Sequence, residues 1–245
     1  MIPCDLQTEL KMSTDTIPKH VAIIMDGNRR WAVKRLMNPS IGHQEGATVV
    51  EKIVRRSIDL NISILTLFAF STENWKRSKT EVEILFSIFY AHLKQMRSYM
   101  IKQGVRLQTI GDLNPLPEDL KKLINTIKKE TEKNQKLELV LAINYGARDE
   151  MARAVKNIAK AVEEGLIESN CIDEKLLESY LDTYRFSDPD LVIRTSGEKR
   201  LSNFLLWQAA YAEFYTTDTL WPDFDEEELN KAVSEYSKRQ RRKGA

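Results

Sequence analysis

Five residues that could bind a phosphate group follow directly after a short apolar run. The run, Val21–Met25, is typical of a buried strand, and the next residues are Asp26, Gly27, Asn28, Arg29 and Arg30. Gly27 permits a tight turn, and Asn28 is the expected N-cap of a following helix. Arginines oppose the dipole at a helix start unless an anion binds there, in which case N–H and guanidinium groups form a phosphate site.

A carboxylate beside a phosphate would repel it unless a divalent cation lay between them, and Mg²⁺ is the usual choice. The segment after Met25 therefore predicts Mg²⁺ and a phosphorylated substrate. The alternative is a surface joint between a strand and a helix, with charges that only meet water.

Two later apolar runs also end in polar and basic residues. Ile64–Phe70 leads into residues 71–77, and the run ending at Ile193 leads into residues 194–203. Ligands of an open parallel sheet bind outside the carboxyl ends of its strands. We therefore expect one group of side chains from these segments to converge in space: Asp26, Asn74, Arg77, Arg194 and Arg200.

Alternating strand and helix patterns predict one α/β domain over residues 17–245, preceded by a flexible arm over residues 1–16. The fold class is a mainly parallel central sheet of about six strands with helices on both faces. The predicted strands are Val21–Met25, Ile64–Phe70, Val105–Ile110, Leu137–Ile143, Leu191–Ile193 and Phe214–Leu220. The predicted helices are Gln44–Leu60, Thr80–Lys102, Pro117–Lys133, Ala147–Glu164 and Asp173–Thr183, with a mobile loop at Asn38–Ser40.

The composition argues against several classes of protein. The net charge is +1, so the chain has no general attraction for nucleic acid, and the basic residues 238–243 more often belong to a solvated helix end. Cys4 and Cys171 form no metal-ligand spacing or disulfide framework, which suits a reducing compartment. We find no apolar stretch of transmembrane length and no signal peptide, and we expect a cytoplasmic protein.

Five segments in this order resemble the cis-prenyltransferase family, the undecaprenyl-diphosphate-synthase-like isoprenyl transferases. They begin at His20, Gly42, Leu65, Ile143 and Asp188, and the resemblance runs from about residue 20 to about residue 224. The segments read HVAIIMDGNRRWA, GHQEGA, LTLFAFSTENWKR, INYGARDE and DPDLVIRTSGEKRLSNFLLWQAAYAEFYTTDTLWPDF.

The resemblance implies the reaction and its two substrates. Isopentenyl diphosphate adds repeatedly to an allylic diphosphate, expected to be farnesyl diphosphate, with a new cis double bond each time. The product would be a long-chain polyprenyl diphosphate, the lipid-carrier precursor for cell-wall glycan synthesis. Mg²⁺ is the implied cofactor, a homodimer is the implied assembly, and product release implies peripheral membrane contact.

The resemblance also implies roles for individual residues. Asp26 positions Mg²⁺ and assists diphosphate departure, with Glu213 as a second metal ligand that reaches across the dimer. Asn74 assists proton removal, and since an amide is a poor base, it would orient a diphosphate oxygen that takes the proton. Gly27, Asn28, Arg29, Arg30 and His43 hold the allylic diphosphate and Arg77 adds positive charge, whereas Arg194, Arg200 and Ser202 hold isopentenyl diphosphate. Further substrate-binding residues, of which Ser71 and Trp75 line the site, are Trp31, Ser71, Thr72, Glu73, Trp75 and Leu201.

His43 and the apolar helix after residue 80 depend on the resemblance for their interpretation. Taken alone, His43 is a lone surface histidine, whereas the family pattern places it against the allylic diphosphate at a helix start. Residues 82–96 are apolar around a wide arc, which by itself indicates a helix buried on two sides. In the family, the corresponding helix walls a hydrophobic tunnel for the growing chain.

The chain departs from the family pattern at Pro39, where relatives often carry a basic residue. Lys34 or Arg35 would have to replace that contact.

The segment Arg242–Gly244 resembles an R-x-G ending that reaches an active site across a dimer, although a disordered basic end is the alternative. A non-catalytic partner subunit of the same fold is the alternative function, disfavoured because such relatives tend to lose the residue equivalent to Asp26.

Overall fold

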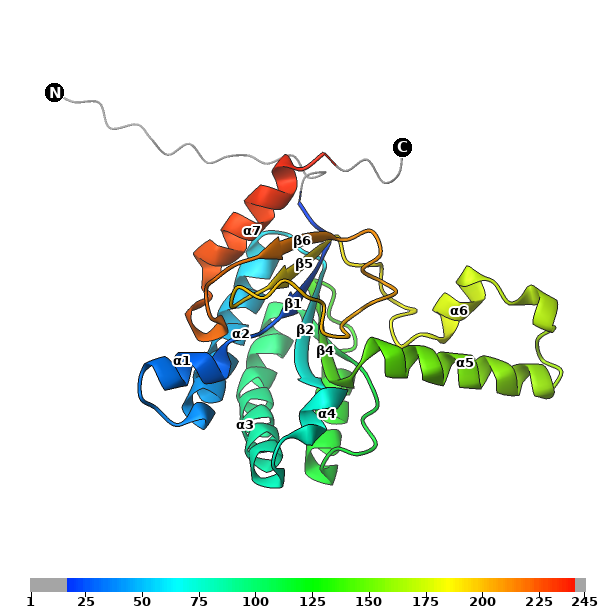
Figure 1. Ribbon diagram of the computed structural model, residues 1–245, viewed down its shortest axis with the longest axis horizontal. Helices are drawn as coiled ribbons and strands as arrows, with labels where there is room; N and C mark the ends of the chain where they lie inside the picture. The colour runs from blue at the N-terminus through cyan, green and yellow to red at the C-terminus, as the bar shows by residue number, and fades with distance from the viewer. Residues whose placement is uncertain (1–16, 241–245) are drawn as a thin grey trace.

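The computed structural model describes residues 17–240, and its centre is one sheet of six parallel strands (Figure 1). The strand order is β3-β4-β2-β1-β5-β6. The strands are β1 (His20–Ile24), β2 (Ile64–Ser71), β3 (Val105–Ile110), β4 (Leu137–Tyr145), β5 (Leu191–Arg194) and β6 (Glu213–Thr216). The α/β fold with a parallel sheet is therefore confirmed. The predicted arm over residues 1–16 lies outside the described residues.

Seven α-helices and three short 3-10 helices lie within the described residues 17–240. The helices are α1 (Asn28–Lys34), α2 (Pro39–Asp59), α3 (Lys79–Gln103), α4 (Glu118–Glu130), α5 (Ala147–Glu163), α6 (Glu174–Tyr180) and α7 (Glu226–Lys238). The 3-10 helices are η2 (Thr72–Lys76), η3 (Ser169–Cys171) and η4 (Trp221–Asp223). No helix in this part of the chain is long and apolar enough to cross a membrane.

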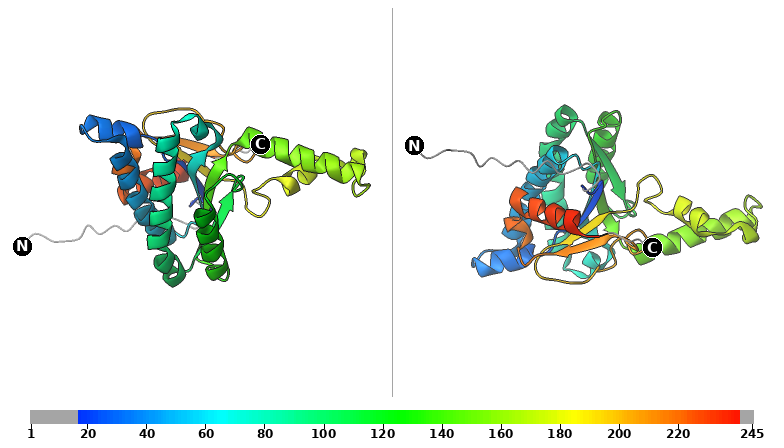
Figure 2. Two further views of the ribbon diagram at one scale, coloured as in Figure 1. Left: turned by 90° about the horizontal axis from the view of Figure 1, so that it is seen from below. Right: turned by 90° about the horizontal axis from the view of Figure 1, so that it is seen from above.

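The two faces of the sheet are covered differently. Buried side chains of α2, α3, α4 and α7 form one large core with the sheet residues that face them. The opposite face packs against the start of α5 and against the segment 201–212, whose Phe204 and Leu205 are fully buried. From there α5 and α6 extend away from the sheet as an arm, visible in all three ribbon views (Figures 1 and 2).

The sequence-based element boundaries were wrong in several places. Asn38–Ser40 is the start of α2 rather than a mobile loop, because the Asn38 side chain accepts a hydrogen bond from the Ser40 N–H at 3.0 Å. The last strand ends at Thr216 rather than residue 220, because its partner β5 ends at Arg194. Helix α7, which no predicted element covered, begins after Asp225, whose carboxylate caps it.

Asn28 was also assigned wrongly, because Gly27 rather than Asn28 precedes the first turn of α1. The Asn28 side chain instead donates to the Met25 carbonyl at 3.1 Å, so it fixes the strand end. Gly27 has φ 106°, and a Cβ atom there would lie 2.9 Å from the Leu220 side chain. Only glycine combines that backbone angle with so close an approach.

Two glycines of α2 bring α1 into its place above the sheet. A Cβ atom at Gly42 would lie 2.0 Å from the Asn28 carbonyl oxygen, and one at Gly46 would lie 2.1 Å from the Asn28 Oδ1 atom. The Trp221 indole N–H donates to the Gly46 carbonyl at 2.7 Å, so Trp221 also contacts α2 at Gly46. The GHQEGA motif therefore serves close helix packing, and an added methyl group would cost about 1–3 kcal/mol.

His20 joins β1 to the amino-terminal end of the neighbouring strands and is almost fully buried. Its Nδ1 atom lies 2.6 Å from the Ser187 carbonyl, which can only accept, so Nδ1 carries the proton. The Nε2 atom then accepts from the Thr66 hydroxyl at 2.8 Å. Burial lowers the pKa of His20 to about 4, since the charged ring would lose its hydration.

This low pKa predicts acid-sensitive stability. A histidine whose folded pKa lies below its unfolded value contributes stability that is present above pH 6.5 and lost as the pH falls toward 4. We expect the His20→Gln variant to be less stable than the wild type at neutral pH. Between pH 7 and pH 5, its free energy of unfolding should fall by about 2 kcal/mol less than that of the wild type. Urea unfolding across that range measures both slopes, and equal slopes would contradict the assignment.

Candidate active site

The ion pair between Asp26 and Arg194 lies at the carboxyl edge of the sheet. Ile24 of β1 pairs in register with Arg194 of β5, so the strands bring the two side chains together. Arg194 donates to Asp26 Oδ2 at 2.8 Å, and the Gly27 N–H donates to Oδ1 at 2.7 Å. The Arg194 side chain is 5% exposed and that of Asp26 34%, so the carboxylate is the member that a ligand can reach.

Arg194 also holds the segment that follows it. Its guanidinium group donates to the Ser202 hydroxyl at 2.7 Å and to the Arg200 carbonyl. The Thr195 hydroxyl donates to the Asp26 carbonyl at 2.6 Å, which binds the two strand ends a second time. Arg194 therefore joins Ser202 to Asp26, whereas Arg200 contributes its carbonyl here and its exposed side chain pairs with Glu198.

Glu198 is an acidic residue of the site that sequence reasoning missed. Its carboxylate lies 3.2 Å from the Arg30 guanidinium, and its other oxygen accepts from Arg200. Arg30 additionally donates to the Ser196 hydroxyl and lies 4.0 Å from Asp26. The spacing of Glu198 between Arg194 and Arg200 was a usable signal, because a lone acid among arginines is their natural counter-ion.

A cavity of about 360 Å³ opens at Asp26 and runs between the sheet and α3. Its charged end contains Asp26, Arg29, Arg30, His43, Asn74 and Arg77. Its other walls are apolar and include Leu67, Ala69, Leu85, Phe89, Met96 and Leu141. The arrangement suits a ligand with an anionic head and a long hydrocarbon tail.

His43 lies one turn inside α2 rather than at the helix start, because α2 begins at Pro39. It nevertheless lines the charged end of the cavity, and its buried Nε2 atom has no hydrogen-bond partner within the described residues. Burial, together with the charges of Arg77 and Arg29, lowers the pKa of His43 to about 4. The ring is therefore neutral at pH 7 until an anion offsets these cations.

Asn74 and Ser71 line the cavity at the end of β2. The Ser71 N–H donates to the Asn74 Oδ1 atom at 3.0 Å, and this capping box starts η2. Arg77 also faces the cavity, where Glu81 accepts from it at 2.9 Å. Asn74 and Arg77 therefore both line the charged end of the cavity, and their roles there stay predictions.

Several predicted substrate residues do not line the cavity. The Trp31 indole donates to Asp223 at 2.6 Å, and the Trp75 indole donates to Asn144 at 2.8 Å. Thr72 donates to Glu73 at 3.2 Å, beside the cavity rather than in it. Leu201 packs with the core on the other face of the sheet. Direct contact of these side chains with a substrate stays a prediction.

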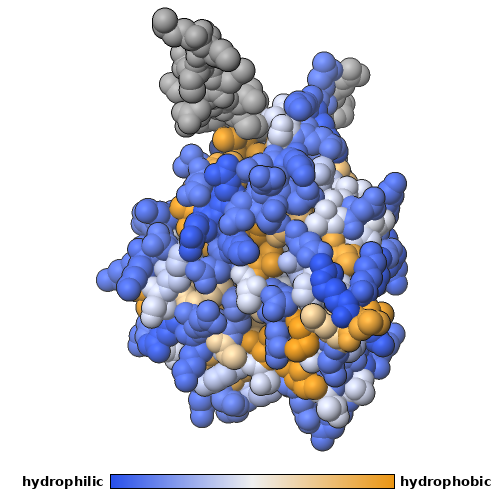
Figure 3. All heavy atoms as spheres, turned by 90° about the vertical axis from the view of Figure 1, so that its left-hand side faces the viewer, coloured by the Kyte–Doolittle hydropathy of each residue, from blue (hydrophilic) through white to orange (hydrophobic). Residues whose placement is uncertain are grey.

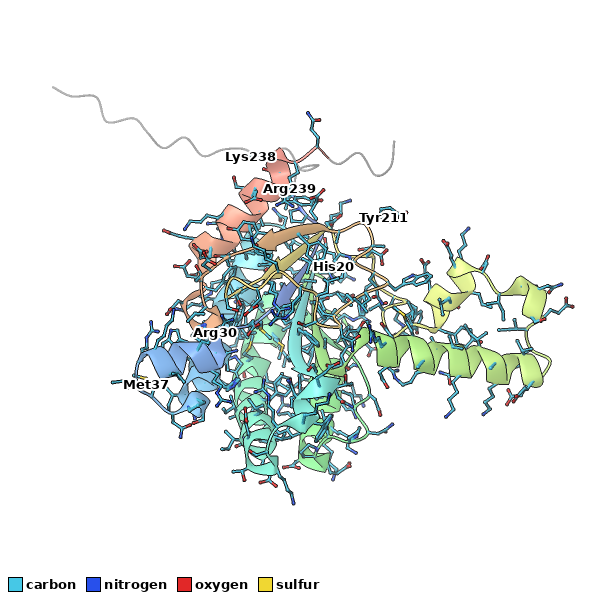
Figure 4. The ribbon with its side chains drawn as sticks, in the orientation of Figure 1. His20, Arg30, Met37, Tyr211, Lys238 and Arg239 are labelled. Atoms are coloured by element: carbon cyan, nitrogen blue, oxygen red, sulfur yellow. The ribbon has the colours of Figure 1, made fainter. Side chains whose placement is uncertain are left out.

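Glu213 lies at the opposite edge of the sheet from Asp26. It is the first residue of β6 and pairs with Leu191, three residues before Arg194. Its carboxylate accepts from Arg239 at 2.9 Å, and Figure 4 labels Arg239 near the top of the molecule, well above Arg30. Within one chain, Glu213 therefore does not share a metal with Asp26.

Neither of the two predicted replacements for a basic residue at position 39 lines the cavity. Arg35 stacks over the Trp31 ring at 4.1 Å and donates to both Asp223 oxygens at 3.2 Å, so its guanidinium group is engaged away from the cavity. Lys34 is exposed and also lies outside the cavity lining. Arg29 faces the cavity and supplies charge there. The predicted tail contact at Arg242–Gly244 lies outside the described residues.

A family model described as "Putative undecaprenyl diphosphate synthase" matches residues 24–244. The chain belongs to this prenyltransferase family. An isoprenyl transferase of Halalkalibacterium halodurans is 49% identical over 233 residues, which cover 95% of this chain and 91% of that protein. One from Geobacillus kaustophilus is 50% identical over 228 residues, which cover 93% of this chain and 89% of that protein.

Two solved structures resemble this prenyltransferase over nearly its whole length. Lavandulyl diphosphate synthase from Lavandula x intermedia, in complex with dimethylallyl diphosphate, has a TM-score of 0.92 at 38% identity, covering 94% of this chain and all of that one. A probable undecaprenyl diphosphate synthase from Campylobacter jejuni has a TM-score of 0.77 at 37% identity, covering 93% and 99%.

Asp26 offers one carboxylate to a metal ion at this site. Within residues 17–240, no three His, Cys, Asp or Glu side chains form a cluster that could hold a metal. Mg²⁺ is commonly held by one or two carboxylates together with substrate phosphates and water. The residues of this prenyltransferase therefore fit Mg²⁺ that arrives with a diphosphate, rather than a closed protein site.

The neutral state of His43 gives a direct test of the anion site. We expect the His43 ring to titrate near pH 4 in the free protein and at a higher pH when inorganic pyrophosphate is bound, because the anion favours the charged ring. The chain has three histidines, so NMR titration of the ring protons, with a His43→Gln variant for assignment, resolves each one. The signal of His20, which lies outside the cavity lining, is the internal control, and a His43 titration unaffected by pyrophosphate would contradict the site.

Proposed function

We propose that this prenyltransferase condenses isopentenyl diphosphate repeatedly, in cis, onto an allylic diphosphate, for which farnesyl diphosphate is the expected primer. One observation carries the proposal. A single cavity has Asp26 and four cationic or imidazole side chains at its mouth and continues into an apolar tunnel along α3. The mouth suits a diphosphate, and the tunnel suits a prenyl chain that lengthens away from the reacting end.

The allylic diphosphate would lie among Arg29, Arg30, His43 and Arg77. These side chains stabilise the negative charge that grows on the diphosphate as its bond to the allylic carbon breaks. Mg²⁺ bound at Asp26 would supply further charge neutralisation for the leaving group. The cations of the chain and the free N–H groups at the start of α1 hold the head group so that the hydrocarbon points into the tunnel.

Isopentenyl diphosphate would bind beside this group, at Arg194, Arg200 and Ser202. Its double bond attacks the allylic carbon, one carbon–carbon bond forms as the carbon–oxygen bond breaks, and one proton leaves. Asn74, which is a poor base, would orient the diphosphate oxygen that takes this proton. Holding the two substrates in reacting geometry contributes to the rate enhancement alongside the stabilisation of charge.

The product would be a long-chain polyprenyl diphosphate, which we propose as the precursor of the lipid carrier for cell-wall glycan synthesis. Each methylene group that enters the tunnel contributes about 0.8 kcal/mol to binding. Long products would therefore bind tightly, and their release would limit turnover. The exposed thiol of Cys171 suits the reducing cytoplasm that we propose as the location.

We further propose a homodimer in which Glu213 serves the partner's metal. The support is the position of Glu213 at the amino edge of its own sheet, beside Arg239 and the start of the C-terminal tail. Glu213 resembles an active-site element of the family, yet it does not lie near Asp26 of the same chain. A second copy is the arrangement that would bring it to a reaction centre.

Product analysis tests the function directly. We expect radiolabelled isopentenyl diphosphate, with Mg²⁺ and farnesyl diphosphate, to yield polyprenyl products that chromatography separates by length. The Asp26→Asn variant should lose at least 100-fold in kcat, because it removes the carboxylate charge with little change in shape. Asp119→Asn, on an exposed turn of α4, is the matched control and should keep the wild-type rate.

A wild-type protein that binds prenyl diphosphates but forms no product would favour the non-catalytic partner subunit. Equal rates for the Asp26→Asn and wild-type proteins would refute the role of Asp26.

The tip after α1 supports the proposed peripheral membrane contact. Val33, Leu36 and Met37 are 55%, 98% and 46% exposed. Figure 3 faces this side of the molecule and shows apolar patches among hydrophilic ones at the height of α1, while Figure 4 places Met37 at the outer tip. Lys34 is exposed beside these apolar residues, so we propose an anionic lipid surface as the partner.

Vesicle sedimentation tests the membrane contact. We expect the protein to sediment with phosphatidylglycerol-containing vesicles and to bind phosphatidylcholine vesicles at least tenfold more weakly, because Lys34 and its neighbours need an anionic surface. Replacing both Leu36 and Met37 by Glu should abolish binding. Leu166→Glu, at another site that is 73% exposed, is the control and should leave binding unchanged.

Equal binding by both variants would refute the α1 surface. A change in oligomeric state for the double variant would instead make this tip a contact between copies of the chain.

A further inference from the structure

Asn203 connects three segments that lie far apart in the sequence. Its side-chain amide donates to the Glu73 carboxylate of η2 at 2.9 Å. Its side-chain oxygen accepts from the Arg148 N–H at 2.9 Å, and its carbonyl accepts from the Ala147 N–H at 2.8 Å, both at the start of α5. One residue thereby joins the ends of β2 and β4 to the segment that follows β5.

Asn203 and its partner Glu73 each adjoin a residue of a different half of the proposed site. Ser202, the preceding residue, accepts a hydrogen bond from Arg194 at 2.7 Å on the isopentenyl diphosphate side. Glu73 directly precedes Asn74, whose side chain faces the cavity at the end of β2. The bond between Asn203 and Glu73 therefore joins the loops that carry the two half-sites, in addition to the sheet that places their strand ends.

The surroundings fix Asn203 in a conformation that few residues adopt. Ser202 and Asn203 have φ angles of 51° and 63°, in the left-handed region where asparagine is favoured over most side chains. Phe204 stacks on Phe68 with ring centroids 4.5 Å apart, and Leu205 is buried, so the backbone on this side is anchored in the core. The side chain of Asn203 consequently has little freedom to turn away from Glu73.

The amide is suited to this position because it donates on one side and accepts on the other. A carboxylate could still accept from the Arg148 N–H but would face Glu73 with like charge. Burial acts to raise the pKa of Glu73, yet its hydrogen bonds, of which the one from Asn203 is the largest, lower it overall. Glu73 is therefore ionised and would repel an acid at position 203.

We infer that Asn203 is a positioning residue that aligns the allylic and isopentenyl diphosphate half-sites through Glu73. The inference rests on the proposed condensation, because alignment of two substrates has meaning only there. It assigns Asn203 no contact with either substrate. The loss of the bond should therefore slow the joint step while each half-site still binds its own ligand.

The test exchanges the donor and the acceptor. We expect Asn203→Asp to lower kcat at least tenfold while the KM of each substrate changes less than threefold. Glu73→Gln keeps an acceptor oxygen, and its kcat is the reference for the double variant. In the double variant N203D/E73Q the glutamine can donate to the new carboxylate, and kcat should return to within threefold of the Glu73→Gln value.

Asn203→Gly keeps the backbone freedom for φ 63° but removes the side chain, so it separates folding from positioning. It should fold and show the same loss in kcat. Asn61→Gly is the matched control, since Asn61 has φ 57° at an exposed turn remote from the cavity, and it should keep the wild-type rate.

A double variant no faster than Asn203→Asp, or an Asn203→Gly variant with wild-type kcat, would overturn the inference. A wild-type protein without turnover would refute the proposed function instead, so the two failures are distinguishable.

Discussion

The site depends on the ion pair between Asp26 and Arg194, two residues that close the ends of adjacent parallel strands. Arg194 is almost fully buried, and a buried guanidinium without a counter-charge would be strongly destabilising. Asp26 supplies that charge and remains partly exposed, so the same carboxylate can also face a metal–diphosphate complex. Arg194 in turn holds Ser202 and the Arg200 carbonyl, and the segment after β5 depends on the pair for its position.

The two faces of the sheet have different roles: one carries the cavity, and the other anchors the segment that follows β5. Helices α2 and α3 cover one face and leave the apolar cavity beside the strands, where a hydrocarbon chain can be buried. The other face anchors residues 201–212 through Phe204 and Leu205, directly after the polar residues that contact Arg194. Catalytic groups thus lie on loops, while the rigid sheet and core fix their distances. The amino edge, with Glu213 and Arg239, takes no part in this arrangement within one chain.

Much of the fold and the site could be predicted because the signals are local. Apolar runs ending in Asp26, Ser71 and Arg194 predicted three strand ends, and the parallel sheet brought them to one edge. The errors arose where distant contacts set the outcome. Asn28 does not cap α1, because its amide bonds back to Met25 and its backbone contacts Gly42. The last strand ends with its partner, which no local pattern within residues 213–220 reveals.

The sequence by itself determined the residue types that can hold diphosphate, the α/β order and the apolar character of α3. Only the tertiary structure decided which of these residues meet. It placed His43 inside a helix yet at the cavity, turned Trp31 toward Asp223, and set Glu213 at the far edge of the sheet. It also joined Asn203 to Glu73 across 130 residues. Local patterns report propensity and burial, whereas side-chain partners depend on strand register and helix packing, which form only when distant segments fold together.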